Sequence, residues 1–216
     1  MEISAKRLRR LILIPAAILV SGIVGSLYSA RRTRNLAEQF LHAAKSLELG
    51  KASLDDVLAV ANASRGTQEG FGSCTPHAEH CTGRVYFENR WLHRWHLAAP
   101  TYFACRFGIK ANKLNDRWCE LVSYRNAGRT DVDWGAFVIE KPSLHLFEGE
   151  REPGTRDKSF RLAGLPSSEM LGVIVTPQTP DNIRTLAYEF DLRCLSNIGG
   201  CRTREEMLPI LNRKNL

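Results

Sequence analysis

The sequence lacks the motifs of the common enzyme classes. It contains no G-x-S-x-G nucleophile elbow, no P-loop, no G-x-G-x-x-G turn and no H-E-x-x-H helix. No two cysteines form a C-x-x-C pair, so a thioredoxin-like role has no motif either. We therefore expect no cofactor, and the sequence favours a binding role over catalysis.

Low-complexity tracts and internal repeats are also absent, which argues against disordered, fibrous and solenoid proteins. A chain of 216 residues is long enough for one domain with a hydrophobic core and additional segments, and too short for two domains of typical size.

Excess positive charge is missing from most of the chain, although the net charge is +7. The first 34 residues hold seven of the 30 basic side chains and one of the 23 acidic ones, which leaves residues 35–216 with a net charge of only about +1. A protein that follows a phosphate backbone needs its positive charge on the folded surface. We therefore expect no nucleic-acid partner.

The chain has one long apolar run, from Leu11 to Tyr28, flanked by basic clusters. Eighteen residues reach about 27 Å as a helix, close to the thickness of the hydrocarbon core. The run predicts a transmembrane anchor over 11–28 that contacts the lipid bilayer, with residues 1–10 as a basic cytoplasmic tail. Pro15 is expected in the first turns of the helix, where the missing N–H costs least.

We expect this anchor to stay uncleaved, because no cut near its end places small residues at both positions that a signal peptidase reads. More basic residues precede the span than follow it, which places the N-terminus in the cytoplasm. Gly22 and Ser26 are four residues apart, a small-residue spacing that can support helix dimers.

All six cysteines follow the span, and an even set on one side predicts disulfides in an oxidising compartment. The main domain, residues 35–216, is therefore expected in the periplasm or outside the cell. Two predicted pairs are local, Cys74 with Cys81 and Cys194 with Cys201. The first pair belongs to the segment CTPHAEHC, for which a metal site and free thiols stay open as alternatives.

The third predicted pair is Cys105 with Cys119, which are equidistant from Asn112 in a turn-like segment between two strand-like runs. A hairpin centred there also places Phe103 opposite Leu121 and Arg106 opposite Trp118.

Four histidines fall within twenty residues, and they define the alternative function. If His77, His80, His93 and His96 converge, they can bind a transition metal, as in a metal-binding protein or a hydrolase. The competing interpretation is that they are surface histidines. The neighbouring Trp91 and Trp95 are expected in the core.

The remaining pattern predicts an α+β fold braced by disulfides. Two helices follow the anchor, the first from Thr33 to Gly50 and the second capped by Ser53 and Asp56. Short runs rich in aromatic and β-branched residues then predict an antiparallel sheet of about five to six strands. Helical spacing returns in the C-terminal part, which ends in a Thr203/Glu206 capping box.

The segments FDLRCLSNIGGCRTREEMLP and LELGKASLDDV, together with the single span, resemble single-span bacterial envelope proteins that have no assigned activity. The resemblance implies the topology and nothing about chemistry. The sequence thus predicts a membrane-anchored binding or scaffolding protein of the cell envelope, with an envelope protein as its expected partner.

Overall fold

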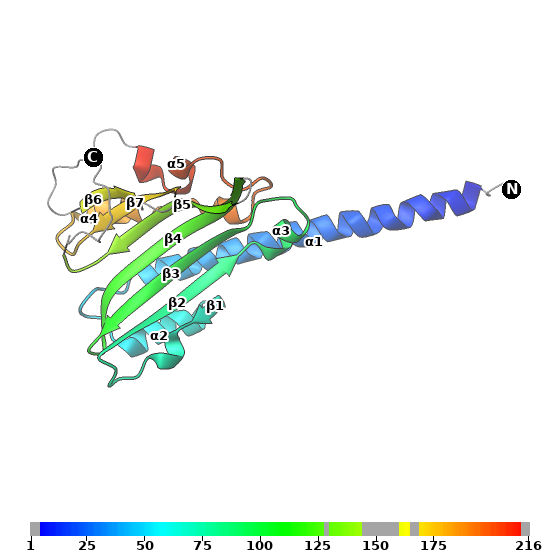
Figure 1. The fold of residues 1–216 in the computed structure, drawn as a ribbon. Helices are drawn as coiled ribbons and strands as arrows, with labels where there is room; N and C mark the ends of the chain where they lie inside the picture. The colour runs from blue at the N-terminus through cyan, green and yellow to red at the C-terminus, as the bar shows by residue number, and fades with distance from the viewer. Residues whose placement is uncertain (1–4, 128–129, 144–159, 165–168, 213–216) are drawn as a thin grey trace.

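The computed structural model describes residues 5–127, 130–143, 160–164 and 169–212 (Figure 1). It confirms the α+β class, with one long N-terminal helix, short helices and one mixed sheet. The helices are α1 (Ala5–Lys45), α2 (Leu54–Ala63), α3 (Arg90–Arg94), α4 (Asp181–Ala187) and α5 (Arg204–Met207), with 3₁₀ turns η1 (Phe71–Ser73), η2 (Leu192–Leu195) and η3 (Pro209–Asn212). The strands are β1 (Thr67–Glu69), β2 (His80–Glu88), β3 (Thr101–Lys110), β4 (Lys113–Ala127), β5 (Thr130–Glu140), β6 (Phe160–Gly164) and β7 (Glu169–Val175).

The seven strands form one sheet in the order β1-β2-β3-β4-β5-β7-β6. All neighbours are antiparallel except β5 and β7, which are parallel because β6 lies at the edge and returns into β7. The count exceeds the predicted five to six strands. One missed strand, β1, has three residues, all exposed, so it carries no alternating apolar pattern.

The membrane-type segment and the first predicted domain helix form one continuous helix, α1, of 41 residues. The anchor over 11–28 and the helix predicted from Thr33 are therefore not separate elements, because no glycine or proline occurs between Tyr28 and Leu47 to end the helix. Pro15 also lies in the helix interior and not in its first turns. Of the predicted tail 1–10, residues 1–4 lie outside the described residues.

The two halves of α1 differ in their surroundings. Most of its apolar part is bare, with Leu13, Ile18 and Val24 each about 60% exposed, although Ser26 is buried. Among the described residues α1 is the one helix long and apolar enough to cross a membrane. Its second half packs on the sheet, where the ring of Phe40 lies 5.4 Å from Phe87 and 6.2 Å from Phe107.

Helix α2 begins as predicted. The Ser53 hydroxyl accepts the Asp56 N–H at 3.2 Å, and the Asp56 carboxylate accepts the Ser53 N–H at 2.8 Å. The Thr203 box before α5 is only half formed. Thr203 accepts the Glu206 N–H at 3.1 Å, but the Glu206 carboxylate accepts from Arg202.

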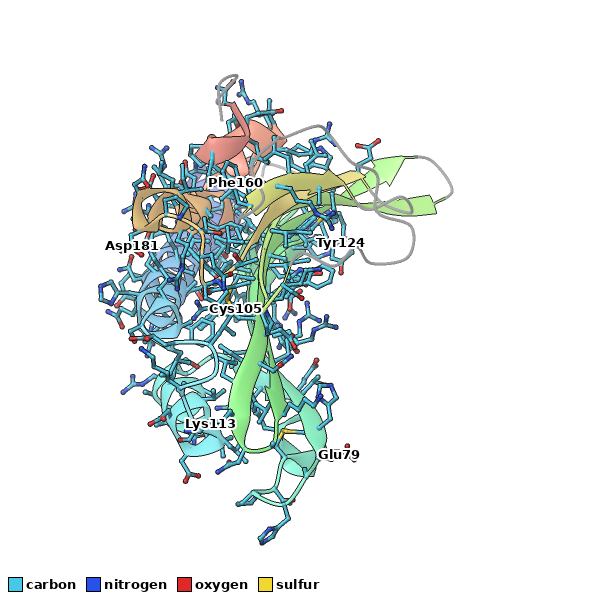
Figure 2. The ribbon with its side chains drawn as sticks, turned by 90° about the vertical axis from the view of Figure 1, so that its left-hand side faces the viewer. Glu79, Cys105, Lys113, Tyr124, Phe160 and Asp181 are labelled. Carbon is cyan, nitrogen blue, oxygen red and sulfur yellow. A yellow bond between two sulfur atoms is a disulfide. The ribbon has the colours of Figure 1, made fainter. Side chains whose placement is uncertain are left out.

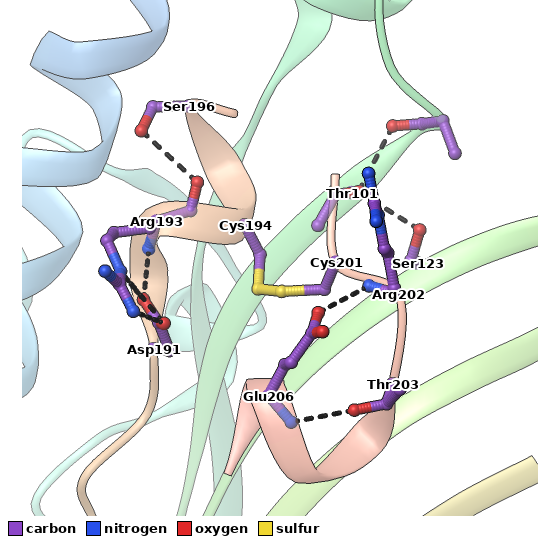
Figure 3. The surroundings of a disulfide bond; sticks show 11 residues. Thr101, Ser123, Asp191, Arg193, Cys194, Ser196, Cys201, Arg202, Thr203 and Glu206 are labelled. Atoms are coloured by element: carbon purple, nitrogen blue, oxygen red, sulfur yellow. Dashed lines mark hydrogen bonds and ion pairs between the residues drawn. A yellow bond between two sulfur atoms is a disulfide. The ribbon is translucent and has the colours of Figure 1, made fainter. Parts of the chain in front are cut away.

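The six cysteines form three disulfides in the predicted pairs, Cys74–Cys81, Cys105–Cys119 and Cys194–Cys201. The last one joins η2 to the loop before α5, beside β3 and β4 (Figure 3). Around it, Asp191 caps η2 through the Arg193 N–H, and Thr101 donates to Ser123 across the two strands.

The predicted β3–β4 register holds from Thr101 to Gly108, including Cys105 opposite Cys119 and Arg106 opposite Trp118. It fails nearer the turn, where a bulge between Gly108 and Ile109 shifts the pairing. The turn is therefore the two residues Ala111 and Asn112, both with positive φ as a type I′ hairpin turn requires.

The helices cover one face of the sheet. Figure 2 shows α1, α2 and α4 on the same side, with Asp181 among them and Tyr124 on the opposite side. The covered face holds the main core, in which Phe103, Cys105 and Leu121 have no exposed surface. The second face carries a smaller apolar cluster that includes Phe137 and Ile174. Over β2, β3 and β4, no helix of the described chain covers this second face.

Candidate functional site: a groove on the open face of the sheet

The alternation of side chains along the strands places most polar and aromatic residues on the second face of the sheet, the one that no described helix covers over β2, β3 and β4; we call it the open face. Most residues of β2, β3 and β4 that face away from the core are polar or aromatic, with the small or apolar Ala104, Gly108 and Val122 between them, whereas their neighbours along each strand are buried in the main core. The side chains that build this face are Thr82, Arg84, Tyr86, Tyr102, Arg106, Trp118, Glu120 and Tyr124.

One end of this face contains a cavity of about 600 Å³. Its walls include the basic residues His80, Arg106 and Lys141, the carboxylate of Asp116 and the apolar surface of Trp118. Asp116 has room there because its partner across the strands is Gly108. A Cβ atom on Gly108 would lie 2.3 Å from the Asp116 carboxylate oxygen.

The middle of the face is organised by two arginines. The Arg84 guanidinium forms an ion pair with Glu120 at 3.0 Å, and the Arg106 guanidinium lies 5.0 Å from the centre of the Trp118 ring. Both contacts hold a planar cation against a defined neighbour, so the two arginines are oriented before any ligand arrives.

The other end of the face is rich in tyrosine. The rings of Tyr102 and Tyr124 lie 5.8 Å apart, and Arg84 lies 5.1 Å from the Tyr102 ring and 5.8 Å from the Tyr86 ring. The Tyr102 hydroxyl donates to Glu120 at 3.4 Å. Burial and then the neighbouring Glu120 carboxylate raise the pKa of Tyr102, so it remains a neutral hydrogen-bond donor.

The face contains three cavities in a row: the first at the His80 end, the second between Arg84 and Arg106, and the third at the tyrosine-rich end. Neighbouring cavities share lining residues and form one elongated depression, which we call the groove. Arg106 and Trp118 line the first and second cavities, and Arg84 lines the second and third. The Trp118 indole N–H is buried and has no hydrogen-bond partner among the described residues. A buried donor without a hydrogen bond costs free energy, so a ligand that places an acceptor next to the Trp118 indole N–H would bind more favourably.

The structure does not bring the four predicted histidines together. His80 pairs with Lys110 at the start of β2, while His93 and His96 follow the other end of that strand. Eight residue steps of β-strand separate these ends, roughly 27 Å. The hypothesis of one four-histidine site is therefore wrong, and His80 is the only member that lines the groove.

The rings of His93 and His96 lie 6.5 Å apart, and His77 is exposed in the loop before β2. In the part of the chain that the structure describes, no three His, Cys, Asp or Glu side chains are placed to hold a metal ion. The disulfide of Cys74 and Cys81 also removes those two sulfurs as thiolate ligands.

The remaining predicted residues, Gly22 and Ser26, do not present a free dimer face. The Ser26 hydroxyl is buried and donates to the Gly22 carbonyl oxygen at 2.8 Å. Trp95 of the same chain lies on Gly22, where an added Cβ would be 2.7 Å from the indole ring.

A second polar cluster was not anticipated from the sequence. Arg117 and Glu140 form an ion pair with each side chain only 1% exposed, and Tyr188 donates to the same carboxylate at 2.9 Å. Complete burial raises the pKa of Tyr188, against the opposing effect of Arg117. The cluster lies in the core between sheet and helices, outside the groove.

Comparisons with known proteins assign no identity, since no family model matches the chain and no curated protein or solved structure is significantly similar to it.

Proposed function

We propose that this protein is a single-pass envelope protein that binds a partner protein in the groove, on the outer side of the membrane. Two features support the location. The bare apolar part of α1 needs a lipid environment, and three disulfides are stable in an oxidising compartment. The basic residues before the span favour an N-terminus in the cytoplasm.

The observation that carries the binding function is the groove itself. It is elongated, lined by four aromatic rings and closed by no element of the described chain. Its charges are mixed: Arg84 and Arg106 are set among Glu120, Asp116 and Glu88. Mixed charge with aromatic surface suits an extended polypeptide segment, because tyrosine, tryptophan and arginine dominate protein interfaces. It does not suit a nucleic acid, which needs a net positive surface.

The alternative is a metal-binding protein or hydrolase, and one observation keeps it in view. His80 and Asp116 line the same cavity, so a base and a carboxylate share one concave site. However, the carboxylate of Asp116 accepts a hydrogen bond from Asn115 at 3.0 Å, and no bond in the described chain joins it to His80.

Site-specific photo-crosslinking in the native membrane tests the proposal. A benzophenone amino acid replaces Thr82 or Arg106, both exposed in the groove, and Ala59, exposed on α2 on the other side of the sheet, as the matched control. The groove positions should yield a discrete protein adduct that the Ala59 position lacks.

Equal labelling at all three positions would contradict the groove as the binding site. Metal analysis of the purified protein addresses the alternative. One equivalent of bound metal that is lost in His80→Ala and retained in His93→Ala would replace the proposal with the metal-binding function.

A further inference from the structure

The exposed large apolar side chains of the described domain gather at one end. Outside α1 there are three: Trp91 at 50%, Trp95 at 39% and Ile198 at 63% exposed. The two tryptophans belong to α3 and its C-terminal cap, and the prediction that they lie in the core is wrong. Figure 1 shows α3 beside α1 at the point where α1 leaves the domain.

This end of the domain is firmly held. Asn89 closes the base of the loop that carries α3, because its side-chain amide donates to Ala99 at 3.2 Å and its carbonyl oxygen accepts from Thr101 at 2.9 Å. Leu92 has no exposed surface and packs with Ala30 of α1.

The same loop holds Ile198 beside α3. The backbone N–H of Gly199 donates to the Leu97 carbonyl oxygen at 2.9 Å. The two tryptophans and Ile198 are thus presented from a braced surface, which we call the interfacial patch.

The patch is continuous with the apolar part of α1. Trp95 lies on Gly22, nine residues before the first charged residue that follows the apolar run, Arg31. Nine residues of helix span about 13 Å, so the indole ring lies well below Arg31, beside the apolar run itself. The headgroup layer on one side of a bilayer is roughly 5–8 Å thick.

The charges around the patch are basic. His93, Arg94 and His96 are exposed beside the tryptophans, and Arg94 lies 5.8 Å from the Trp91 ring. The acidic Glu88 nearby is paired with Arg90 at 2.7 Å. Tryptophan next to arginine is the composition found where membrane proteins meet the headgroups.

We infer that the interfacial patch inserts through the outer headgroup layer to the upper acyl chains of the bilayer that α1 crosses, as a second membrane contact. This inference rests on the proposed membrane anchoring of α1. A second copy of the chain fits less well, because a partner seated on Trp95 would itself have to lie against the bare part of α1.

Tryptophan quenching by lipid tests the inference on the full chain. The protein is reconstituted in phosphatidylcholine and phosphatidylglycerol vesicles, with or without bromine atoms near the top of the acyl chains. The emission of the wild-type protein should fall in brominated vesicles. This loss should largely disappear in the Trp91→Phe, Trp95→Phe double variant and persist in Trp118→Phe, since Trp118 lies in the groove. Far-ultraviolet circular dichroism checks that each variant is folded.

Flotation of the vesicles separates the two proposals. If the chain floats but bromine quenches the wild-type and the double variant equally, the patch does not touch lipid and the anchor stands. If the tryptophans are unquenched and chemical crosslinking gives a dimer, a second copy covers the patch and the inference is overturned. If the chain does not float, both proposals fail.

Discussion

The guanidinium of Arg117 in β4 donates to the carbonyl oxygen of Ala44 in the last turn of α1. It also donates to the carbonyl oxygen of Leu47 at 3.2 Å. The last carbonyl groups of a helix have no hydrogen-bond donor within the helix and carry partial negative charge. A buried guanidinium at this end supplies both a donor and a positive charge. The same guanidinium pairs with Glu140, which joins the end of α1 to two strands of the sheet.

Replacing Arg117 by Met should destabilise the domain strongly. The change removes one cationic partner of the buried Glu140 carboxylate, which keeps Arg184 and Tyr188. It also removes a donor to the carbonyl oxygens of Ala44 and Leu47. Breaking a buried ion pair costs about 3–5 kcal/mol. Urea unfolding followed by circular dichroism measures the loss. Arg106→Met on β3 is the matched control, because Arg106 is exposed. This substitution should change the free energy of unfolding by less than about 1 kcal/mol.

Two tyrosines should make the protein sensitive to alkali. The pKa values of Tyr102 and Tyr188 are raised in the folded state, by burial in both cases. Stability from such groups is complete below the unfolded pKa of about 10 and is lost as the pH rises above it, because only the unfolded chain releases these protons readily.

Absorbance titration of phenolate should therefore show a late fraction of ionisation that coincides with unfolding. Tyr102→Phe and Tyr188→Phe should each reduce that fraction. A smooth titration of all tyrosines before unfolding would contradict the prediction.

The contact of Trp95 with Gly22 predicts different outcomes for two glycines of one helix. Gly25→Ala should stabilise the protein by about 0.5–1 kcal/mol, because nothing lies within 4 Å of its added Cβ and alanine favours the helix. Gly22→Ala should gain less or lose stability, because Trp95 must move. Thermal unfolding in detergent gives the stabilities, and a shift of tryptophan emission only in Gly22→Ala would locate the cause.

The topology predicts a specific digestion pattern. Protease added to spheroplasts should remove the domain and leave a short anchored fragment that contains the apolar part of α1. Protection of the domain until the membrane is lysed would place it in the cytoplasm and would remove the compartment argument for the disulfides.

Some of this structure could be predicted because its determinants are local. The β3–β4 register follows from two cysteines placed evenly about a turn and from alternating apolar residues such as Phe103. The cap of α2 needs only Ser53 and Asp56, three residues apart. A bulge leaves no such pattern, so the pairing next to the turn was shifted by one residue.

The groove and the buried cluster depend on contacts across long sequence separations. Arg117 meets Tyr188, 71 residues away, and Arg84 meets Glu120, 36 residues away. No periodicity connects such residues, because the sheet order decides which side chains become neighbours. The histidines were grouped by their closeness in sequence, and an extended strand then separated them.

In the proposed anchoring, the continuity of α1 would fix the height of the groove above the bilayer. From Gly22, beside the interfacial patch, to Lys45 the helix continues for 23 residues, or about 35 Å. The cavity with His80 and Asp116 lies near that far end, where the Leu114 carbonyl oxygen accepts from Gly50 at 2.7 Å. The helix has no hinge there, and the second contact through α3 would stop the domain from tilting. In the proposed anchoring, partners that stay at the lipid surface would pass beneath this cavity, and it would receive segments that project about 2 nm beyond the level of Arg31.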